Sequence, residues 1–119
     1  MTEHSEVIID IGLDFAKKPW GRTLAKHGLF SGEVFREKMF KPALKKYDIV
    51  TINLSNARGL GTSFLHEAIS KVAYDFDWNL KTFKQHVKIV SDVRPELKPL
   101  IFEFAEQEYE RRARFGAKK

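Results

Sequence analysis

The sequence contains no cysteine, only seven glycines and four prolines in 119 residues, and no long apolar run. Without cysteine, both a disulfide framework and a thiolate metal site are excluded. No segment approaches the ~20 apolar residues that a membrane span requires, so we expect no membrane-spanning segment. The first six residues are polar and lack a signal-peptide pattern, which predicts a cytoplasmic location.

The remaining composition is typical of one folded domain. Hydrophobic residues make up 43% of the chain, with ten Phe and two Trp, which is enough to bury a single core. We therefore expect one domain over residues 1–119. The net charge of +5 favours acidic partners or nucleic acid. Part of that charge lies in a basic tail at about 111–119, whose cations would also oppose a helix dipole: Arg111, Arg112, Arg114, Lys118 and Lys119.

β-Branched and alternating apolar residues predict three strands. They lie within Glu6–Phe15 and at Tyr47–Leu54 and His86–Asp92. The second has a nearly continuous apolar middle, which predicts burial on both of its faces. The Leu13–Leu29 region has room for a further short strand that periodicity alone does not reveal.

Apolar residues at steps of three and four predict the helices. They begin at Ser31, Thr62, Leu80 and about Lys98. Ser31 is a good capping residue, and Asn79 is expected to cap the short third helix. Pro42 should kink or restart the first helix, because proline lacks the backbone donor. Strands that alternate with helices predict an α/β layer architecture with helices packed on the sheet.

The clearest stretch is a strand, Asp48–Ser55, a tight turn, Asn56–Gly61, and a helix beginning at Thr62. The helix start offers unpaired backbone N–H groups beside the hydroxyls of Thr62 and Ser63, where an anion, a phosphoryl group or a partner's carboxylate would fit. Helix capping, worth ~1 kcal/mol, is the simpler interpretation of Thr-Ser at this position. Gly59-x-Gly61 lacks the third glycine of a dinucleotide fingerprint, so nucleotide binding is an alternative only through the helix terminus.

Neither a metal site nor a catalytic site is indicated. The histidines stand in separate predicted elements without His-x-x-x-His spacing: His4, His27, His66 and His86. Ser63 is not within a Gly-x-Ser-x-Gly elbow, so no catalytic residue and no cofactor are expected. Nucleic-acid binding is supported by charge alone, because no helix-turn-helix, zinc finger or aromatic-basic strand signature is present.

Two sequence blocks form a pattern that is more specific than either block alone. One contains Val50–Ser55 and Gly59–Ala68, with the segment Thr-Ser-Phe-Leu-His-Glu-Ala. The upstream block contains Pro-Trp-Gly-Arg22, His27-Gly28, Ser31–Glu37 and Pro-Ala-Leu44. Together the blocks span roughly Ile8 to Val72, and they resemble the STAS-like domain family of uncharacterised bacterial proteins. The resemblance implies a STAS-like α/β fold, for which we expect a mixed four- or five-stranded sheet with helices packed on it.

The resemblance also implies a function. In the wider group of anti-sigma-factor antagonists, a serine at the helix start is phosphorylated by a histidine-kinase-like ATPase, and the unphosphorylated domain binds that kinase. Ser63, or Thr62, matches that serine, although the antagonists have an aspartate where this chain has Gly61-Thr62. A phosphate there would gain from the helix dipole and reshape the docking face. That face would comprise Arg58, Gly59, Leu60, Gly61, His66 and Glu67.

Polar residues of the upstream block have no role that the resemblance supplies: Arg22, Ser31, Glu33 and Arg36. We expect a long loop over Lys17–Phe30, and we expect Arg22 and Arg36 to tie this loop to the following helix through Glu33. The leading hypothesis is a non-enzymatic regulatory domain that binds a protein partner, such as a histidine-kinase-like ATPase. The alternatives are a nucleotide-binding module that uses the same helix terminus and a basic protein associated with nucleic acid.

Overall fold

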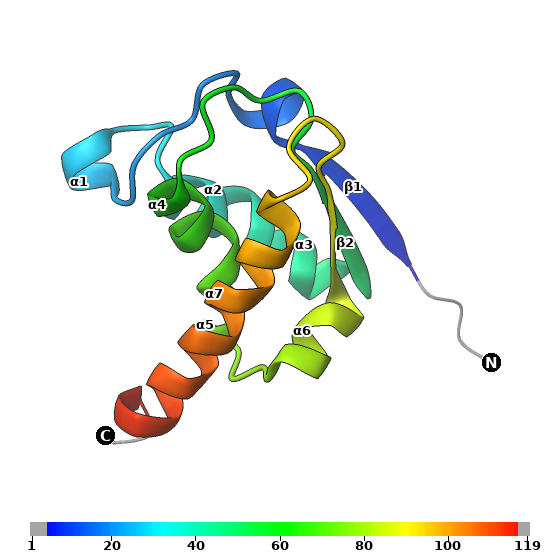
Figure 1. Ribbon diagram of the computed structural model, residues 1–119, viewed down its shortest axis with the longest axis vertical. Helices are drawn as coiled ribbons and strands as arrows, with labels where there is room; N and C mark the ends of the chain where they lie inside the picture. Colours follow the sequence, from blue (N-terminus) through cyan, green and yellow to red (C-terminus); the bar gives the residue numbers. More distant parts are fainter. Residues whose placement is uncertain (1–4, 117–119) are drawn as a thin grey trace.

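The computed structural model describes residues 5–116 and contains a small parallel sheet with helices on one side (Figure 1). His4 and the last two cations of the basic tail, Lys118 and Lys119, lie outside the described residues. The strands are β1 (Glu6–Asp10), β2 (Ile49–Asn53) and β3 (Val87–Val90). They pair in parallel in the order β1-β2-β3, with Val7 opposite Val50 and Val50 opposite Val87.

The expected mixed sheet of four or five strands is therefore not confirmed: residues 5–116 form three strands, and both pairings are parallel. The Leu13–Leu29 region contributes no strand. After β1, the Asp10 carboxylate accepts a hydrogen bond from the Leu13 backbone N–H at 3.0 Å, which starts the π-helical turn η1 (Ile11–Phe15). This local bond ends the strand, because it turns the chain back at Asp10.

Most of the remaining chain is helical. The helical elements are α1 (Leu24–His27), α2 (Gly32–Phe35), η2 (Arg36–Phe40), α3 (Lys41–Lys46), α4 (Thr62–Leu65), η3 (His66–Ser70), α5 (Val72–Asp75), α6 (Leu80–His86), α7 (Leu97–Arg111) and η4 (Arg112–Gly116), where η marks a π-helical segment. Ser31 and Asn79 cap α2 and α6 as expected. The predicted restart near Pro42 is absent: Phe40 and Lys41 both have helical backbone angles, so η2 continues into α3, and Pro42 lies in the first turn of α3.

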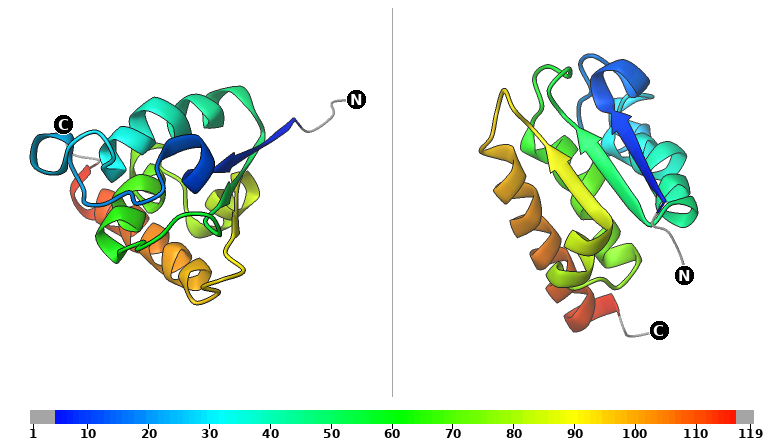
Figure 2. Two further views of the ribbon diagram at one scale, coloured as in Figure 1. Left: turned by 90° about the horizontal axis from the view of Figure 1, so that it is seen from above. Right: turned by 90° about the vertical axis from the view of Figure 1, so that its right-hand side faces the viewer.

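The helices cover one face of the sheet, and the opposite face is open (Figure 2, right). Ile9, Val50 and Ile52 point into the core, whereas Ile8 is 67% exposed on the other face. Thr51 is only half-buried, so the predicted burial of the second strand on both faces is wrong. The order β1-β2-β3 explains this result, because two successive right-handed crossovers place both connections on the same side of the sheet.

The core joins this sheet to an aromatic cluster under the helices. Phe35 is fully buried, and its ring centroid lies 5.3 Å from that of Phe15 and 6.4 Å from that of Phe64. Gly32 lets α2 approach the helix α4–η3 closely. A Cβ atom at Gly32 would lie 2.8 Å from the Cβ of Glu67 and 2.9 Å from the Phe64 carbonyl oxygen. This close approach brings the start of α2 next to the start of α4.

Candidate functional site

The long loop before α2 is held by hydrogen bonds at both of its ends. The backbone N–H groups of Gly32 and Glu33 donate to the carbonyl oxygens of Gly21 and Arg22, at 2.9 and 2.8 Å. The Nδ1 atom of His27 accepts from the backbone N–H of Arg22 at 3.0 Å. Gly21 has φ +80°, and a Cβ atom there would lie 2.1 Å from the His27 ring. These contacts therefore hold the loop in one conformation and fix the positions of its side chains.

The turn between β2 and α4 places two hydroxyl groups on the surface. Leu60 is buried and anchors the turn, and Gly59 has φ +61°, a conformation that favours glycine. Gly61 is the N-cap residue of α4 and provides no side-chain cap. Thr62 and Ser63 are the first helical residues, and both are exposed. The capping interpretation of these two residues is thus wrong, because the cap position is one residue earlier.

A cleft of about 580 Å³ brings the two sequence blocks together. It is lined by loop residues Trp20, Arg22 and His27 and by α4 residues Thr62, Ser63 and Phe64. The Trp20 indole is 57% exposed and meets the His27 ring edge-on, with 4.7 Å between centroids. The cleft combines an exposed aromatic ring, a cation and two hydroxyls, which suits an anionic or amphipathic group of a partner.

Behind the cleft, Arg36 and Glu67 form a buried ion pair. Their exposed fractions are 6% and 8%, and Arg36 Nη1 lies 2.9 Å from Glu67 Oε2. The same nitrogen donates to the Glu67 carbonyl oxygen. Arg22 Nη1 approaches Glu67 Oε1 at 3.7 Å from the cleft side, and Lys71 Nζ lies 3.5 Å from Oε2. Glu67 thus links the loop, α2–η2 and η3.

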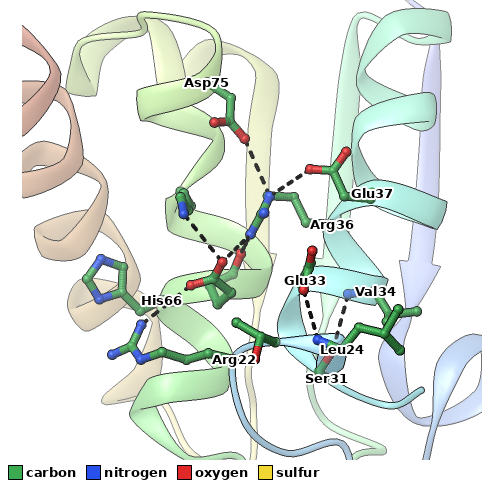
Figure 3. A network of polar contacts seen from close by, with 12 residues as sticks. Arg22, Leu24, Ser31, Glu33, Val34, Arg36, Glu37, His66 and Asp75 are labelled. Carbon is green, nitrogen blue, oxygen red and sulfur yellow. Dashed lines mark hydrogen bonds and ion pairs between the residues drawn. The ribbon is translucent and has the colours of Figure 1, made fainter. Parts of the chain in front are cut away.

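The other edge of the Arg36 guanidinium faces two carboxylates (Figure 3). Arg36 Nε lies 3.1 Å from Glu37 Oε2 and 3.4 Å from Asp75 Oδ2. Lys41 Nζ lies 3.0 and 3.3 Å from the same two oxygens. Burial tends to raise the pKa of Glu37, but Lys41 and Arg36 outweigh it and hold that pKa below its usual value. The network therefore joins α5 to the helix that begins at Gly32.

The expected link through Glu33 is wrong. Glu33 Oε1 instead accepts from the backbone N–H of Leu24 at 2.8 Å (Figure 3). Arg22 and Arg36 meet at Glu67, which belongs to the facing helix. The sequence gives no signal for this pairing, because residues 36 and 67 come together only when the helices pack at Gly32.

His66 is held against α7 and does not line the cleft. Its Nε2 lies 2.6 Å from Glu108 Oε2, and its ring stacks on Phe104 with centroids 4.6 Å apart. Arg111 Nη2 donates to Glu108 Oε1 at 2.7 Å. Burial tends to raise the pKa of Glu108, but hydrogen bonds from His66 and Arg111 lower it to about 2. This contact ties the start of η3 to the end of α7.

The residues expected on the docking face therefore divide into two groups. Gly59 and Gly61 line the cleft with the two hydroxyls, and Arg58 is exposed but lies outside the cleft lining. Leu60 and Glu67 are buried, and His66 is held against α7. Trp20 and His27, which line the cleft, were absent from the expected face. The signal that points to them is the upstream block itself, in which Pro-Trp-Gly-Arg22 precedes His27-Gly28.

Two cations of the basic tail, Arg111 and Arg112, make contacts with other parts of the chain. The Arg111 guanidinium lies 4.2 Å from the centroid of the Tyr74 ring. Arg112 Nη1 donates to the Tyr74 carbonyl oxygen at 2.7 Å, and its Nε lies 3.5 Å from Asp77 Oδ1. These contacts dock the end of α7 on the end of α5, so both residues have a local structural role.

The described residues contain no cluster of His, Asp and Glu that would hold a metal ion. None of the helices within residues 5–116 has the length and apolarity needed to cross a membrane.

Comparisons with known proteins place the chain in a family. Residues 31–95 match the family described as a STAS-like domain of unknown function (DUF4325). Comparisons with curated proteins and with solved structures found no match. The matched range contains α2, β2, α4 and β3 and both members of the Arg36–Glu67 pair, while Trp20 and Arg22 lie before it. Because the match covers more than half of the 119 residues, the chain belongs to this family of STAS-like domains.

Proposed function

We propose that this chain is a non-enzymatic regulatory domain that binds a protein partner at the cleft between the long loop and α4. The observation that carries the proposal is the convergence of Thr62 and Ser63 with Trp20 and Arg22 at one cleft. Tryptophan and arginine are the residues that most often dominate binding at protein interfaces. Both lie beside hydroxyls whose modification would change the charge of the surface.

The loop next to the cleft carries an unusual number of exposed apolar side chains. Trp20, Leu24, Leu29 and Phe30 are each about half or more exposed, with values of 57%, 49%, 69% and 51%. Single exposed apolar residues are ordinary, but several in one short loop favour a contact with another protein. A partner that covers this loop would reach the hydroxyls of α4 in the same interface.

Ser63 is the proposed phosphoacceptor, with Thr62 as the alternative, and a separate histidine-kinase-like ATPase is the proposed partner. In the transfer, Ser63 Oγ forms a bond to the γ-phosphorus of ATP. The bond from that phosphorus to the leaving ADP oxygen breaks, and the hydroxyl proton passes to a base on the kinase. The phosphoryl group adds about −2 of charge beside Arg22 and the apolar loop, which would weaken a partner fitted to the neutral surface.

A pull-down from lysate of the source organism tests the proposal. Wild type, Ser63→Ala and Ser63→Asp are compared, with Lys45→Glu as a control because Lys45 is exposed on α3. We expect wild type, Ser63→Ala and the control to retain the same ATPase, and Ser63→Asp to lose it. Phosphopeptide mapping after incubation with ATP assigns the acceptor to Ser63 or Thr62. Equal retention by Ser63→Asp, or no retained protein, contradicts the proposed switch.

A nucleotide is the second candidate ligand for the same cleft. About 580 Å³ is within the usual range of small-molecule sites, and the Trp20 ring and Arg22 suit a base and a phosphate. A rise in melting temperature with ATP that is lost in Trp20→Ala would favour this function. Salt-sensitive retention on DNA that is lost on deletion of residues 111–119 would favour nucleic acid as the partner instead.

A further inference from the structure

We infer that the cavity between η1 and the β2–α4 turn binds a small aromatic carboxylate. The cavity has a volume of about 390 Å³, which is within the usual range of small-molecule sites. It is lined by three apolar and three cationic residues: Phe15, Ala16, Phe30, Lys17, Lys18 and Arg58. None of them lines the cleft at α4, so this is a second site, and the inference goes beyond the function proposed above.

Aromatic rings form the apolar part of this cavity. The Phe15 and Phe30 rings meet edge-on, with 6.0 Å between their centroids. The Phe15 ring also lies 5.3 Å from that of Phe35 and 6.4 Å from that of Phe64, and both of these are fully buried. Phe15 is thus held by the core, whereas Phe30 is 51% exposed. A ligand ring placed against Phe30 would cover apolar surface that is open to solvent and would gain an aromatic pair.

Backbone hydrogen bonds hold the segments that carry the cations next to each other. The backbone N–H of Arg58 donates to the Lys17 carbonyl oxygen at 2.7 Å, which joins the β2–α4 turn to the chain that follows η1 (Figure 1). The backbone N–H of Trp20 donates to the Phe30 carbonyl oxygen at 3.1 Å. The lining residues therefore come from three chain segments whose positions are fixed relative to one another.

Lys17, Lys18 and Arg58 form no ion pair with any carboxylate of residues 5–116. Asp14 is close in sequence, but its carboxylate accepts from the Asp10 backbone N–H at 2.8 Å and does not line the cavity. By contrast, five arginines elsewhere in the chain have a carboxylate oxygen within 3.7 Å: Arg22, Arg36, Arg94, Arg111 and Arg112. The positive charge at the cavity is therefore not compensated within residues 5–116, and it attracts an anion.

The charges and the rings together select the ligand. A planar guanidinium such as that of Arg58 can donate two parallel hydrogen bonds to one carboxylate, and the two lysines add point charges beside it. An inorganic anion would leave the Phe30 ring uncovered, and an uncharged ring would not use the cations. Because the volume lies near the lower end of the range for small-molecule sites, we expect a ligand with one ring and a short chain.

Titration of the isotopically labelled protein with 3-phenylpropionate at neutral pH tests the inference by amide chemical shifts. We expect shift changes centred on residues 15–18, 30 and 58, with a dissociation constant of about 1 mM or lower. Three control probes separate the parts of the ligand. Acetate lacks the ring, 3-phenylpropanol lacks the charge, and 3-phenylpropylamine reverses the charge. Each control probe should bind about tenfold more weakly or worse.

Protein variants show whether the ligand lies in this cavity. Arg58→Met and Phe30→Ala should each weaken binding of 3-phenylpropionate by about threefold or more. The combined change Lys17→Met, Lys18→Met and Arg58→Met should weaken it by about tenfold or more. Lys45→Met is the matched control for general attraction to a basic protein, because Lys45 is exposed on α3 and does not line the cavity, and it should leave binding unchanged. Arg58→Met alone serves if the other variants do not fold, because this side chain is exposed.

Four outcomes would overturn the inference. They are no shift change at residues 15–18 with tens of millimolar 3-phenylpropionate, equal binding of acetate or 3-phenylpropanol, binding that Arg58→Met and Lys45→Met weaken equally, and unchanged binding by Arg58→Met. Shift changes centred on residues 61–64 would also overturn it, because they would place the ligand in the cleft at α4. The last result would leave the proposed switch at Ser63 untouched, since that proposal is tested by retention of a protein partner.

Discussion

Removal of the Arg36 guanidinium should destabilise the fold more than any change to an exposed cation. In Arg36→Met the side chain keeps its apolar stem, but Glu67 loses its 2.9 Å partner and its carbonyl oxygen loses a donor. Loss of one member of a buried ion pair typically costs about 3–5 kcal/mol, because the other charge stays buried without compensation. Arg22 and Lys71 partly compensate Glu67, at 3.7 and 3.5 Å. We therefore expect Arg36→Met to lower the free energy of unfolding by about 3 kcal/mol, the lower end of that range.

Urea unfolding of Arg36→Met, Glu67→Gln and the double variant measures this energy and its origin. Glu67→Gln alone should cost about 2 kcal/mol, because Arg36 still faces Glu37 and Asp75. The double variant should lose about 3 kcal/mol, less than the sum of the two singles, which gives a coupling energy of about 2 kcal/mol. The melting temperature of Arg36→Met should fall by about 12 °C.

Arg58→Met is the matched control, since the Arg58 side chain is exposed and its bond to the Lys17 carbonyl oxygen uses the backbone N–H, which the change keeps. Its stability should change by less than about 0.5 kcal/mol. A loss below about 1 kcal/mol in Arg36→Met, or strict additivity in the double variant, would show that the network does not hold the helices together.

Three further predictions concern stability and its dependence on pH. Gly32→Ala should cost about 1–3 kcal/mol in urea unfolding, because its Cβ would lie 2.9 Å from the Phe64 carbonyl oxygen; unchanged stability would mean that the helices separate freely. Because the pKa of Glu108 is lowered to about 2, the stability that the ionised carboxylate gives the fold is present above pH ~4.5 and is lost as pH falls toward 2. Glu108→Gln should abolish this part of the acid sensitivity, and a stability–pH profile identical to that of wild type would refute the prediction. Asn79→Ala should cost ~1 kcal/mol through loss of the 2.9 Å cap to Thr82, whereas thermal unfolding that matches wild type would contradict a role for the cap.

Local patterns account for the parts of the fold that were predicted from the sequence. The three strands and the caps at Ser31 and Asn79 depend on residues that are close in the chain. Family membership was also predictable, because the motif around Thr62 and Ser63 lies within one continuous stretch, and the match over residues 31–95 confirms it.

Tertiary packing alone decided the rest. The order of the strands left one sheet face open, which apolar periodicity within a strand cannot reveal. Glu67, and not Glu33, joins Arg22 to Arg36, because the close approach at Gly32 brings residues 31 positions apart within hydrogen-bond distance. The same packing brings Trp20 to the cleft at Ser63. By itself the sequence determined which segments are strands and helices, since these depend on local backbone preferences. The site forms only in the tertiary structure, because long-range contacts bring the long loop next to the start of α4.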